Sequence, residues 1–506
     1  MCGSSAPPGA LRSCGLFGLA VAASYAFPGQ AKAQDDAATT DSPPADCPDR
    51  SFDYVRSEET LAAYKDRRCD RDAFDRLRYI DLSGDGNTVL SLGGELRVRY
   101  ELFSETDFGD SRPDSDGSYQ GRAYAIAELR HGDLFRGVVN VRYAEQIDIE
   151  AGQIAPIDAG GLDLQEAFAE IGSPESVSLR IGRQEISYPL APPSRLLSAR
   201  NGPNVRRNWD AIRLISHIGD WRTDSFYAQL VNIEDGDFDD SSNADTELWG
   251  AYAFGPAPWA DGEDGDQLNL YYYGLNDVEP SFQGGSSQDG SLQGGSLQGG
   301  SGAETRHTFG ARYVTDAGGE GFDLDAEGAW QVGDIGEADI SAGFAAADFG
   351  WTTATDWSLR LGGQLFASTG DSDPDDGEVG TFNELFPSGA YLNDAALLRG
   401  QNILSASPRL SMRPTDRISL RAFYTHYWRS EGNDGLYAQS GRLQRAGTPD
   451  DSREIGGYLG ARGSYGINHR TTFRVQAGRF FAGRFLQDTG SAEDTTFLRI
   501  DLEFQI

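Results

Sequence analysis

The sequence predicts an all-β protein: a transmembrane antiparallel up-and-down β-barrel of about 18 strands, with short periplasmic turns and long extracellular loops. Three features predict it: apolar and polar residues alternate, short and long connections alternate, and the N-terminus resembles an export signal. From Leu90 to Leu102 apolar residues take every second position, and the stretch from Leu498 to Ile506 repeats this pattern. Such alternation is typical of a strand with one apolar and one wet face.

Residues 1–33 are predicted to be a secretory signal peptide that is cleaved near Ala33. Arg12 precedes an apolar stretch from Leu16 to Phe27, and the small-residue site Ala31-Lys32-Ala33 follows it. The apolar stretch is too short to cross a bilayer as a helix. Together with the strand pattern, this signal predicts that the mature chain resides in the bacterial outer membrane.

Residues 34–85 are expected to form a periplasmic N-terminal segment. Cys2 and Cys14 would leave with the signal peptide, so Cys47 and Cys69 remain as an even pair in an oxidising compartment. That pair predicts one disulfide, with two free buried thiols as the alternative. A helical turn or two is expected around 57–64, where Ser57 is a candidate cap. The segment is expected to clip the barrel mouth, or to be a simple leader.

Residues 86–506 are predicted to form the barrel itself. Two of the candidate strands fit poorly, because the alternation slips between Leu164 and Phe168, as at a β-bulge, and because 337–349 consists mostly of alanine and glycine. The candidate strands lie near 89–103, 119–131, 135–147, 162–172, 176–186, 208–217, 222–233, 245–255, 267–275, 304–315, 322–332, 337–349, 356–369, 400–413, 416–429, 453–466, 470–480 and 495–506.

Short and long connections alternate between these strands. Gly219-Asp220 and Pro414-Thr415-Asp416 are short, whereas 187–207 and 370–399 are long. Outer-membrane barrels have this asymmetry, and a soluble sandwich has no reason for it. A barrel of this size is expected to enclose an aqueous channel. The Gly/Ser-rich stretch 284–302 is predicted to be a disordered extracellular loop.

Overall charge and motif content exclude several function classes. The net charge of −35 argues against nucleic acid as a partner. The five histidines are scattered, and the chain has neither an HExxH zinc motif nor a GxSxG nucleophile elbow. The acidic run Asp371 to Glu378 does not match the glycine and glutamate positions of an EF-hand, so a solvated acidic loop is favoured over a calcium site. The sequence therefore predicts no enzyme, no cofactor and no metal site.

The loop from Ser187 to Trp209 is rich in arginine although the protein is acidic. It contains no aspartate or glutamate, but it contains Arg195, Arg200, Arg206 and Arg207. Guanidinium groups pair bidentately with carboxylates, so one interpretation is a loop at the pore that attracts carboxylated sugars. The alternative is a surface loop that binds lipopolysaccharide phosphates or neighbouring acidic loops.

Many strands carry one arginine on their polar face. A charge facing lipid at the bilayer midplane costs roughly 2–4 kcal/mol, so these side chains are expected to face the lumen and to bind a polyanion weakly. About half are expected only to brace the wall by pairing with acids such as Glu95 and Glu101. The candidates are Arg97, Arg99, Arg142, Arg180, Arg213, Arg312, Arg360, Arg421, Arg462 and Arg474.

Stretches along the whole mature chain resemble the alginate export family of outer-membrane barrels. The most specific are "NGPNVRRNWDAIRL" and "LRIGRQEISY", and "LSLGGELRVRYE", "FNELFPSGAYLND" and "HRTTFRVQAGRFFAGRFLQDTG" extend the resemblance. The resemblance implies a monomeric pore of about 18 strands with an arginine-rich constriction that passes a polyuronate.

The sequence thus predicts a passive outer-membrane channel for an anionic polysaccharide or its oligomers, using an arginine-lined lumen. A general diffusion porin without polyuronate specificity is the alternative, and a barrel with a plugged lumen is a third hypothesis. The expected partners are the acidic polysaccharide, outer-membrane lipid and lipopolysaccharide, and the barrel assembly machinery.

Overall fold

The computed structural model describes residues 47, 52–110, 117–148, 157–173, 175–190, 194–234, 236–259, 265–278, 280, 302–315 and 320–506. The predicted signal peptide and nearly all of the Gly/Ser-rich stretch 284–302 lie outside these residues. Among the described residues, no helix is long and apolar enough to span a membrane.

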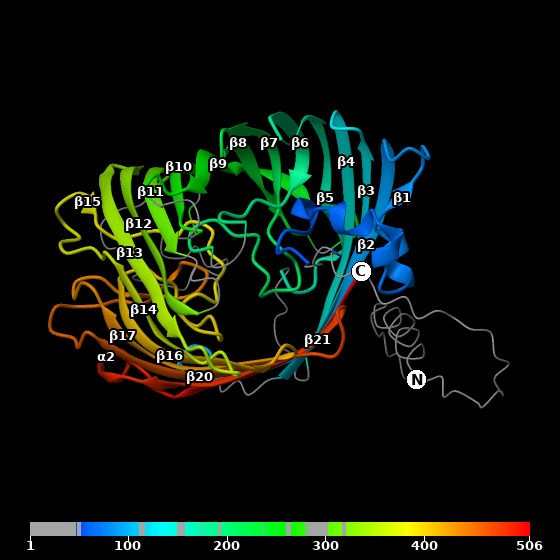
Figure 1. Ribbon diagram of the computed structural model, residues 1–506. Coiled ribbons are helices and arrows are strands. Elements are labelled where there is room, and N and C mark those ends of the chain that lie inside the picture. The colour runs from blue at the N-terminus through cyan, green and yellow to red at the C-terminus, as the bar shows by residue number, and fades with distance from the viewer. Residues whose placement is uncertain are drawn as a thin grey trace, which may run out of the picture. The chain divides into compact units, whose positions relative to one another are not determined.

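Eighteen antiparallel strands close into a barrel (Figure 1). Neighbours in sequence pair around the ring, and the last strand pairs with the first, with Arg99 opposite Asp501. The strands are β2 (Thr88–Ser104), β3 (Gly117–His131), β4 (Phe135–Asp148), β5 (Gly161–Gly172), β6 (Val177–Gln184), β7 (Trp209–Ile218), β8 (Trp221–Asn232), β9 (Ser241–Pro256), β10 (Gln267–Asp277), β11 (Glu304–Thr315), β12 (Gly321–Ile335), β13 (Ala338–Thr352), β14 (Arg360–Ser368), β16 (Ile403–Thr415), β17 (Ile418–Arg429), β20 (Glu454–Gly466), β21 (Thr471–Ala482) and β22 (Thr495–Gln505).

The predicted barrel and strand order are confirmed, including the predicted irregularity in β5. Asn140 of β4 pairs with Glu166, but Val141 pairs with Leu164, so Gln165 is an extra residue and forms a bulge. Two connections depart from the predicted alternation. Only residues 336–337 join β12 to β13, at the end of the barrel where the other connections are longer, and residues 257–266 join β9 to β10 at the end where the other connections are short.

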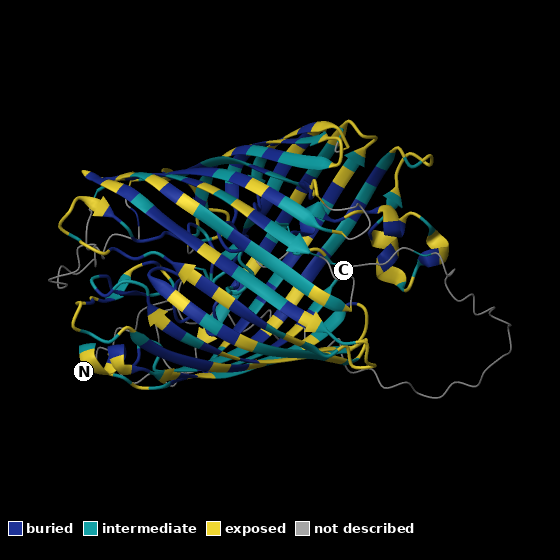
Figure 2. Ribbon diagram, turned by 60° about the vertical axis from the view of Figure 1, so that its left-hand side comes forward, coloured by how far each residue is buried: buried dark blue, intermediate teal, exposed yellow. Residues whose placement is uncertain are grey.

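Side chains alternate between the two faces of the barrel wall. In β2, Leu96 and Val98 are 41% and 44% exposed, whereas the arginines beside them, Arg97 and Arg99, are 2% and 4% exposed. Figure 2 shows the resulting bands of buried and exposed residues along the strands. The exposed side chains are apolar and therefore suit contact with lipid, and the charged side chains face the lumen.

The lumen is partly filled, which differs from the expected open aqueous interior. Two segments fold into it: inner loop 1 (185–190 and 194–208, between β6 and β7) and inner loop 2 (369–402, between β14 and β16). Leu197 of inner loop 1 and Leu385 of inner loop 2 belong to one buried apolar cluster with the wall residues Phe344 and Tyr427. Figure 1 shows coil segments running inside the ring of strands.

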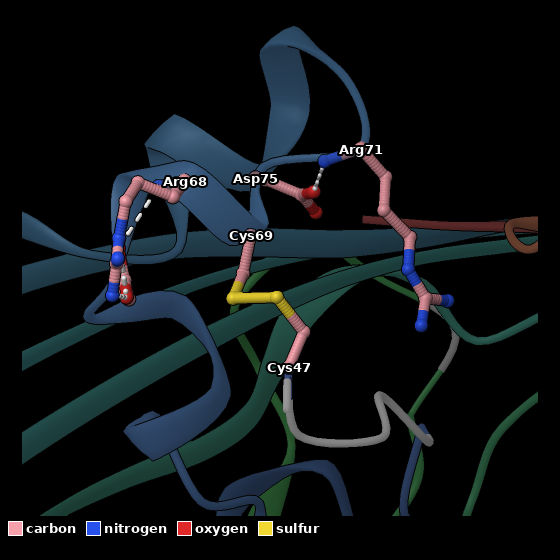
Figure 3. Close-up of a disulfide and its surroundings, with 6 residues drawn as sticks. Cys47, Arg68, Cys69, Arg71 and Asp75 are labelled. Atoms are coloured by element: carbon pink, nitrogen blue, oxygen red, sulfur yellow. Dashed lines mark hydrogen bonds and ion pairs between the residues drawn. A yellow bond between two sulfur atoms is a disulfide. The ribbon is translucent and has the colours of Figure 1, made fainter. Parts of the chain in front are cut away.

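The N-terminal segment consists of short 3₁₀ turns at the end of the barrel where the short turns lie. These are η2 (Arg56–Glu58), η3 (Ala62–Tyr64), η4 (Arg67–Cys69) and η5 (Ala73–Leu77), and β1 (Ile80–Asp81) then pairs with β2. Ser57 is not a helix cap, contrary to the expectation, because it lies inside η2 and its hydroxyl donates to Glu166 at 2.7 Å. The predicted disulfide joins Cys47 to Cys69 (Figure 3).

Smaller elements occur in the long loops. The strand β15 (Glu378–Val379) lies parallel to β13, and β18 (Leu436–Tyr437) pairs with β19 (Leu443–Arg445). The helix α2 (Arg484–Thr489) precedes β22.

Candidate functional site

The two inner loops meet inside the barrel and divide the lumen. Ser198 N donates to Phe386 O at 2.9 Å, and Phe386 N donates to Leu196 O at 2.8 Å. Residues 198–207 of inner loop 1 and 385–388 of inner loop 2 together form a partition across the lumen. Tyr54 of the N-terminal segment reaches this partition, where its hydroxyl lies 3.0 Å from Ser198 Oγ.

Two cavities lie on either side of the partition. The short-turn cavity, of about 800 Å³, is lined by Asn201, Gly202 and Ser388 of the partition and by residues near the short turns. The long-loop cavity, of about 360 Å³, is lined by Arg200, Arg207 and Phe386 of the partition and by residues near the long loops. The partition is therefore the narrow region between two hollows that face opposite ends of the barrel.

The short-turn cavity carries more positive than negative charge. Two of its lining residues, Asp325 and Asp348, are acidic, and five are arginines. Arg413 forms no ion pair with a carboxylate in the described part of the chain, and Arg421 donates only to Ser411 Oγ at 3.2 Å. The surplus charge thus comes from side chains that keep their guanidinium groups free for a ligand. The five arginines are Arg360, Arg409, Arg413, Arg421 and Arg462.

Three arginines line the long-loop cavity beside the partition. Arg207 donates to Ser198 O at 2.9 Å and to Phe386 O at 2.7 Å, both of them neutral acceptors. Burial, together with the like charges of Arg200 and Arg399, lowers the pKa of Arg207 well below its ordinary value. Among the described carboxylates, Glu384 lies 3.9 Å from Arg399, and Asp158 attracts Arg200 without forming an ion pair with it. An anion entering this cavity would offset that mutual repulsion.

Most of the other candidate arginines are paired along the wall. Arg142 contacts Asp240 at 2.7 Å, and Arg180 contacts Glu170 at 2.8 Å. Glu95 and Glu101, expected to be bracing acids, pair with Arg122 and Arg499. Further members of the candidate set with carboxylate partners are Arg99 (Asp501), Arg213 (Asp224), Arg312 (Asp325), Arg360 (Asp323), Arg462 (Asp394) and Arg474 (Glu503).

The four arginines of inner loop 1 have different surroundings. Arg195 contacts Glu327 at 2.6 Å and Asp348 at 2.9 Å, which fixes the loop to the barrel wall. Arg206 pairs with Glu185 at 2.7 Å within its own loop. Arg200 and Arg207 form no ion pair with a described carboxylate, so these two leave charge available at the partition. On the wall, Arg97 likewise donates only to neutral groups, at Asn201, Pro203 and Asn204.

Sequence reasoning missed three arginines that line the cavities. Arg409 and Arg413 lie on the inner face of β16, where Ser405, Ser407 and Ser411 alternate with them, and that serine pattern was the available signal. Arg399 had no such signal, because it lies in inner loop 2 among apolar and small residues.

Stacked aromatic rings cover part of the inner wall at β9 and β10. Tyr188 of inner loop 1 stacks on Tyr252 with 4.5 Å between ring centroids, and Tyr271 stacks on Tyr273 at 5.0 Å. All four rings are buried, so this side of the lumen is packed, and the open space lies toward β14–β20.

Two acidic groups within the described residues have a spacing that a metal ion could use. Asp72, Asp75 and His469 form one group, but Arg470 already contacts both aspartates. Asp163, Asp239 and Asp240 form the other, in which Asp240 pairs with Arg142. Arginine therefore neutralises part of each group.

A model of the alginate export family matches residues 88–498 of this chain. Three crystal structures from Pseudomonas aeruginosa share the fold, each at 12% identity and each over 82% of this chain and 98% of its own length. OccK9 (OpdG) has a TM-score of 0.55, OpdK with vanillate 0.53, and OccK2 (OpdF) in complex with glucuronate 0.52. At this identity the likeness is one of fold alone. No curated protein matches the sequence.

Proposed function

Because the chain belongs to the alginate export family, we propose that this outer-membrane channel passively conducts an anionic polysaccharide, or its oligomers, of the polyuronate type. The transported chain would cross the lumen through the short-turn cavity, the partition and the long-loop cavity. The guanidinium groups along this path would bind its carboxylates one after another.

One observation carries the proposal: arginines without carboxylate partners gather at the cavities. Arg413 and Arg421 line the short-turn cavity, and Arg200 and Arg207 line the long-loop cavity. Charges at a constriction act at close range, whereas the acids of the outer loops are screened within about 8–10 Å by salt. The local surplus of positive charge would therefore decide ion selectivity although the chain is acidic overall.

The chemistry of the arginines favours a carboxylate-bearing sugar. Guanidinium groups pair with carboxylates through two parallel hydrogen bonds, and many weak sites let a polyanion move without sticking. OccK2 (OpdF), a barrel of the same fold, was crystallised in complex with glucuronate, which is a uronate. That complex supports the substrate class by analogy of fold.

A general diffusion porin is the second candidate function. The net charge of −35 favours it, as do Asp325 and Asp348 in the short-turn cavity, because carboxylates on the path attract cations. This alternative leads to cation selectivity and to no block by polyuronate.

The remaining assignments follow from the same proposal. Residues 1–33 would be removed near Ala33, 34–85 would remain in the periplasm and 86–506 would form the barrel in the outer membrane. The chain would act as a monomer in contact with outer-membrane lipid and lipopolysaccharide, inserted by the barrel assembly machinery, and would transport rather than catalyse.

Planar bilayers test the proposal directly. The purified barrel should prefer anions in a salt gradient, and guluronate oligomers should block its current at concentrations at which neutral oligomers of equal length do not. Cation preference together with indifference to guluronate would support the general porin instead.

A further inference from the structure

The N-terminal segment inserts a closed loop into the barrel at the short-turn end. The disulfide between Cys47 and Cys69 closes this loop, and residues 52–64 form its inserted part. Arg56 Nη2 donates to the C-terminal Ile506 O at 2.8 Å, and the hydroxyl of Tyr54 lies 3.0 Å from Ser198 in the partition. Arg206 of inner loop 1 stacks on the Tyr54 ring at 4.7 Å. The inserted part therefore reaches from the barrel mouth to the partition.

Glu58, in this inserted part, is bound by three arginines of the barrel wall. Its carboxylate contacts Arg180 at 2.8 Å, Arg213 at 3.2 Å and Arg222 at 3.3 Å. The side chains of Glu58 and Arg213 are only 10% and 1% exposed. These arginines hold the pKa of Glu58 well below its ordinary value in spite of burial. Glu58 is therefore a charged carboxylate in a site built from guanidinium groups.

The barrel wall alone does not neutralise this site. Its own carboxylates are Glu170, which pairs with Arg180, and Asp224, which pairs with Arg213 and Arg222. Arg136 also contacts Glu170, at 3.4 Å, but it pairs more closely with Glu128, at 2.7 Å. The guanidinium groups of Arg180, Arg213 and Arg222 thus face two wall carboxylates, and Glu58 supplies a third negative charge. These guanidinium groups can therefore bind one further carboxylate, either that of Glu58 or that of a ligand.

Aromatic rings shape the same site. The guanidinium of Arg180 lies 4.4 Å from the Phe168 ring centroid, and that of Arg213 lies 5.5 Å from the Tyr188 ring centroid. Such stacking fixes the planes of both groups, so that their N–H bonds have defined directions. Preoriented donors of this kind suit a planar carboxylate better than a spherical ion.

We infer that Arg180, Arg213 and Arg222 form a binding site for a uronate carboxylate at the periplasmic end of the channel, and that Glu58 occupies it when no substrate is present. The inference rests on the proposed function. An incoming polyuronate competes with Glu58 for the same guanidinium groups. Its binding releases the inserted part, and the loop then leaves both the mouth and the partition. The channel is closed by its own carboxylate and opened by that of its substrate.

Hydrogen exchange of the full-length protein in detergent tests this inference without a mutation. A guluronate tetrasaccharide should speed amide exchange in residues 52–64 about tenfold, and cellotetraose, a neutral tetrasaccharide, should leave it unchanged. Bilayer recordings on the same preparation report current block by the same two sugars. If guluronate blocks the current but slows or does not change exchange in 52–64, the gating inference is overturned and the proposed function stands. If guluronate affects neither, both are overturned.

Variants separate the site from the loop in general. In Glu58→Gln, exchange in 52–64 should already be about tenfold faster than in the wild type, and guluronate should add less than twofold. Arg222→Gln changes the wall side of the same contact and should act in the same direction, so the test does not depend on one variant folding. Asp220→Asn removes an exposed carboxylate at the same end of the barrel and should exchange like the wild type. Equal exchange in all three variants would contradict the inference.

Discussion

Arg207 is attached to inner loop 2 through Phe386: its guanidinium donates to Phe386 O at 2.7 Å and lies 5.2 Å from the Phe386 ring centroid. The adjacent Arg206 instead pairs with Glu185 at 2.7 Å. Two neighbouring arginines thus differ in charge balance, since the charge of Arg206 is neutralised and that of Arg207 is not.

This difference predicts that Arg207→Gln will lower anion selectivity more than Arg206→Gln. Removing Arg207 takes away a charge that no described carboxylate balances. Removing Arg206 instead leaves Glu185, whose pKa burial already raises to about 7, and this carboxyl then takes up a proton, so the net charge at the partition changes little. The reversal potential of a single channel in a tenfold salt gradient measures the effect. The anion-to-cation permeability ratio should fall severalfold in Arg207→Gln. An unchanged ratio would show that the partition does not control selectivity.

The short-turn cavity predicts weaker uronate binding when its free arginines are removed. Arg413→Gln and Arg421→Gln each delete a guanidinium group without breaking an ion pair described in the structure. Each should raise the half-blocking concentration of guluronate oligomers about tenfold, which corresponds to about 1.4 kcal/mol. Arg442→Gln, at an exposed arginine that lines neither cavity and has no described ion pair, is the matched control and should block like the wild type.

A pH dependence is predicted for inner loop 2. Burial raises the pKa of Asp371 to about 7, from an ordinary value near 3.8. The negative charge of the nearby Asp434 acts on this pKa in the same direction. The folded loop then binds a proton that the unfolded loop has lost, so loop stability falls as pH rises from about 4 to 7. Amide exchange in 371–382, corrected for intrinsic rates, should be at least roughly tenfold faster at pH 8 than at pH 5.

Asp371→Asn should abolish this pH dependence, since an amide keeps the oxygen that accepts from Asp373 N and carries no charge. Its loop should stay as protected at pH 8 as the wild-type loop is at pH 5. If amide exchange in 371–382 of the variant still changed with pH as in the wild type, the titrating group would be a residue other than Asp371.

The disulfide is predicted to stabilise the inserted state of the N-terminal segment. It joins residues 22 positions apart, and closing a loop of that length restricts the unfolded chain by about 3 kcal/mol. In the double variant Cys47→Ser and Cys69→Ser, residues 52–64 should exchange at least tenfold faster, while β2–β22 keep their protection. Faster exchange throughout the barrel would mean that the bond stabilises the whole fold.

The lipid-facing position of Leu365 predicts a stability cost for charge there. Leu365 is 50% exposed on the outer face of β14, near the middle of the strand. Leu365→Arg should lower the free energy of unfolding by about 2–4 kcal/mol in a lipid bilayer, because a charge near the midplane is poorly solvated. Leu365→Ala, which changes size without adding charge, should cost less in the same urea titration. Equal costs would place this face outside the membrane.

Local periodicity in the sequence specifies the wall of this barrel. Ile212 and Leu214 face outward and Arg213 faces inward, because successive side chains along a strand point to opposite faces. Whether a residue faces lipid or the lumen can therefore be read from its position in the strand. The β5 bulge was detectable in the same way, since one extra residue shifts the parity. Strand ends were predictable because polar, glycine-rich connections interrupt the alternation.

The filling of the lumen and the pairing of its arginines depend on contacts between segments that lie far apart in the sequence. Arg207 and Phe386 are 179 positions apart, and Glu58 and Arg213 are 155 apart. No local pattern encodes such contacts, because inner loops and the N-terminal segment have no strand periodicity to fix their direction. Closure of the ring brings these distant segments into one enclosed space, where burial makes the pairing of each charge decisive.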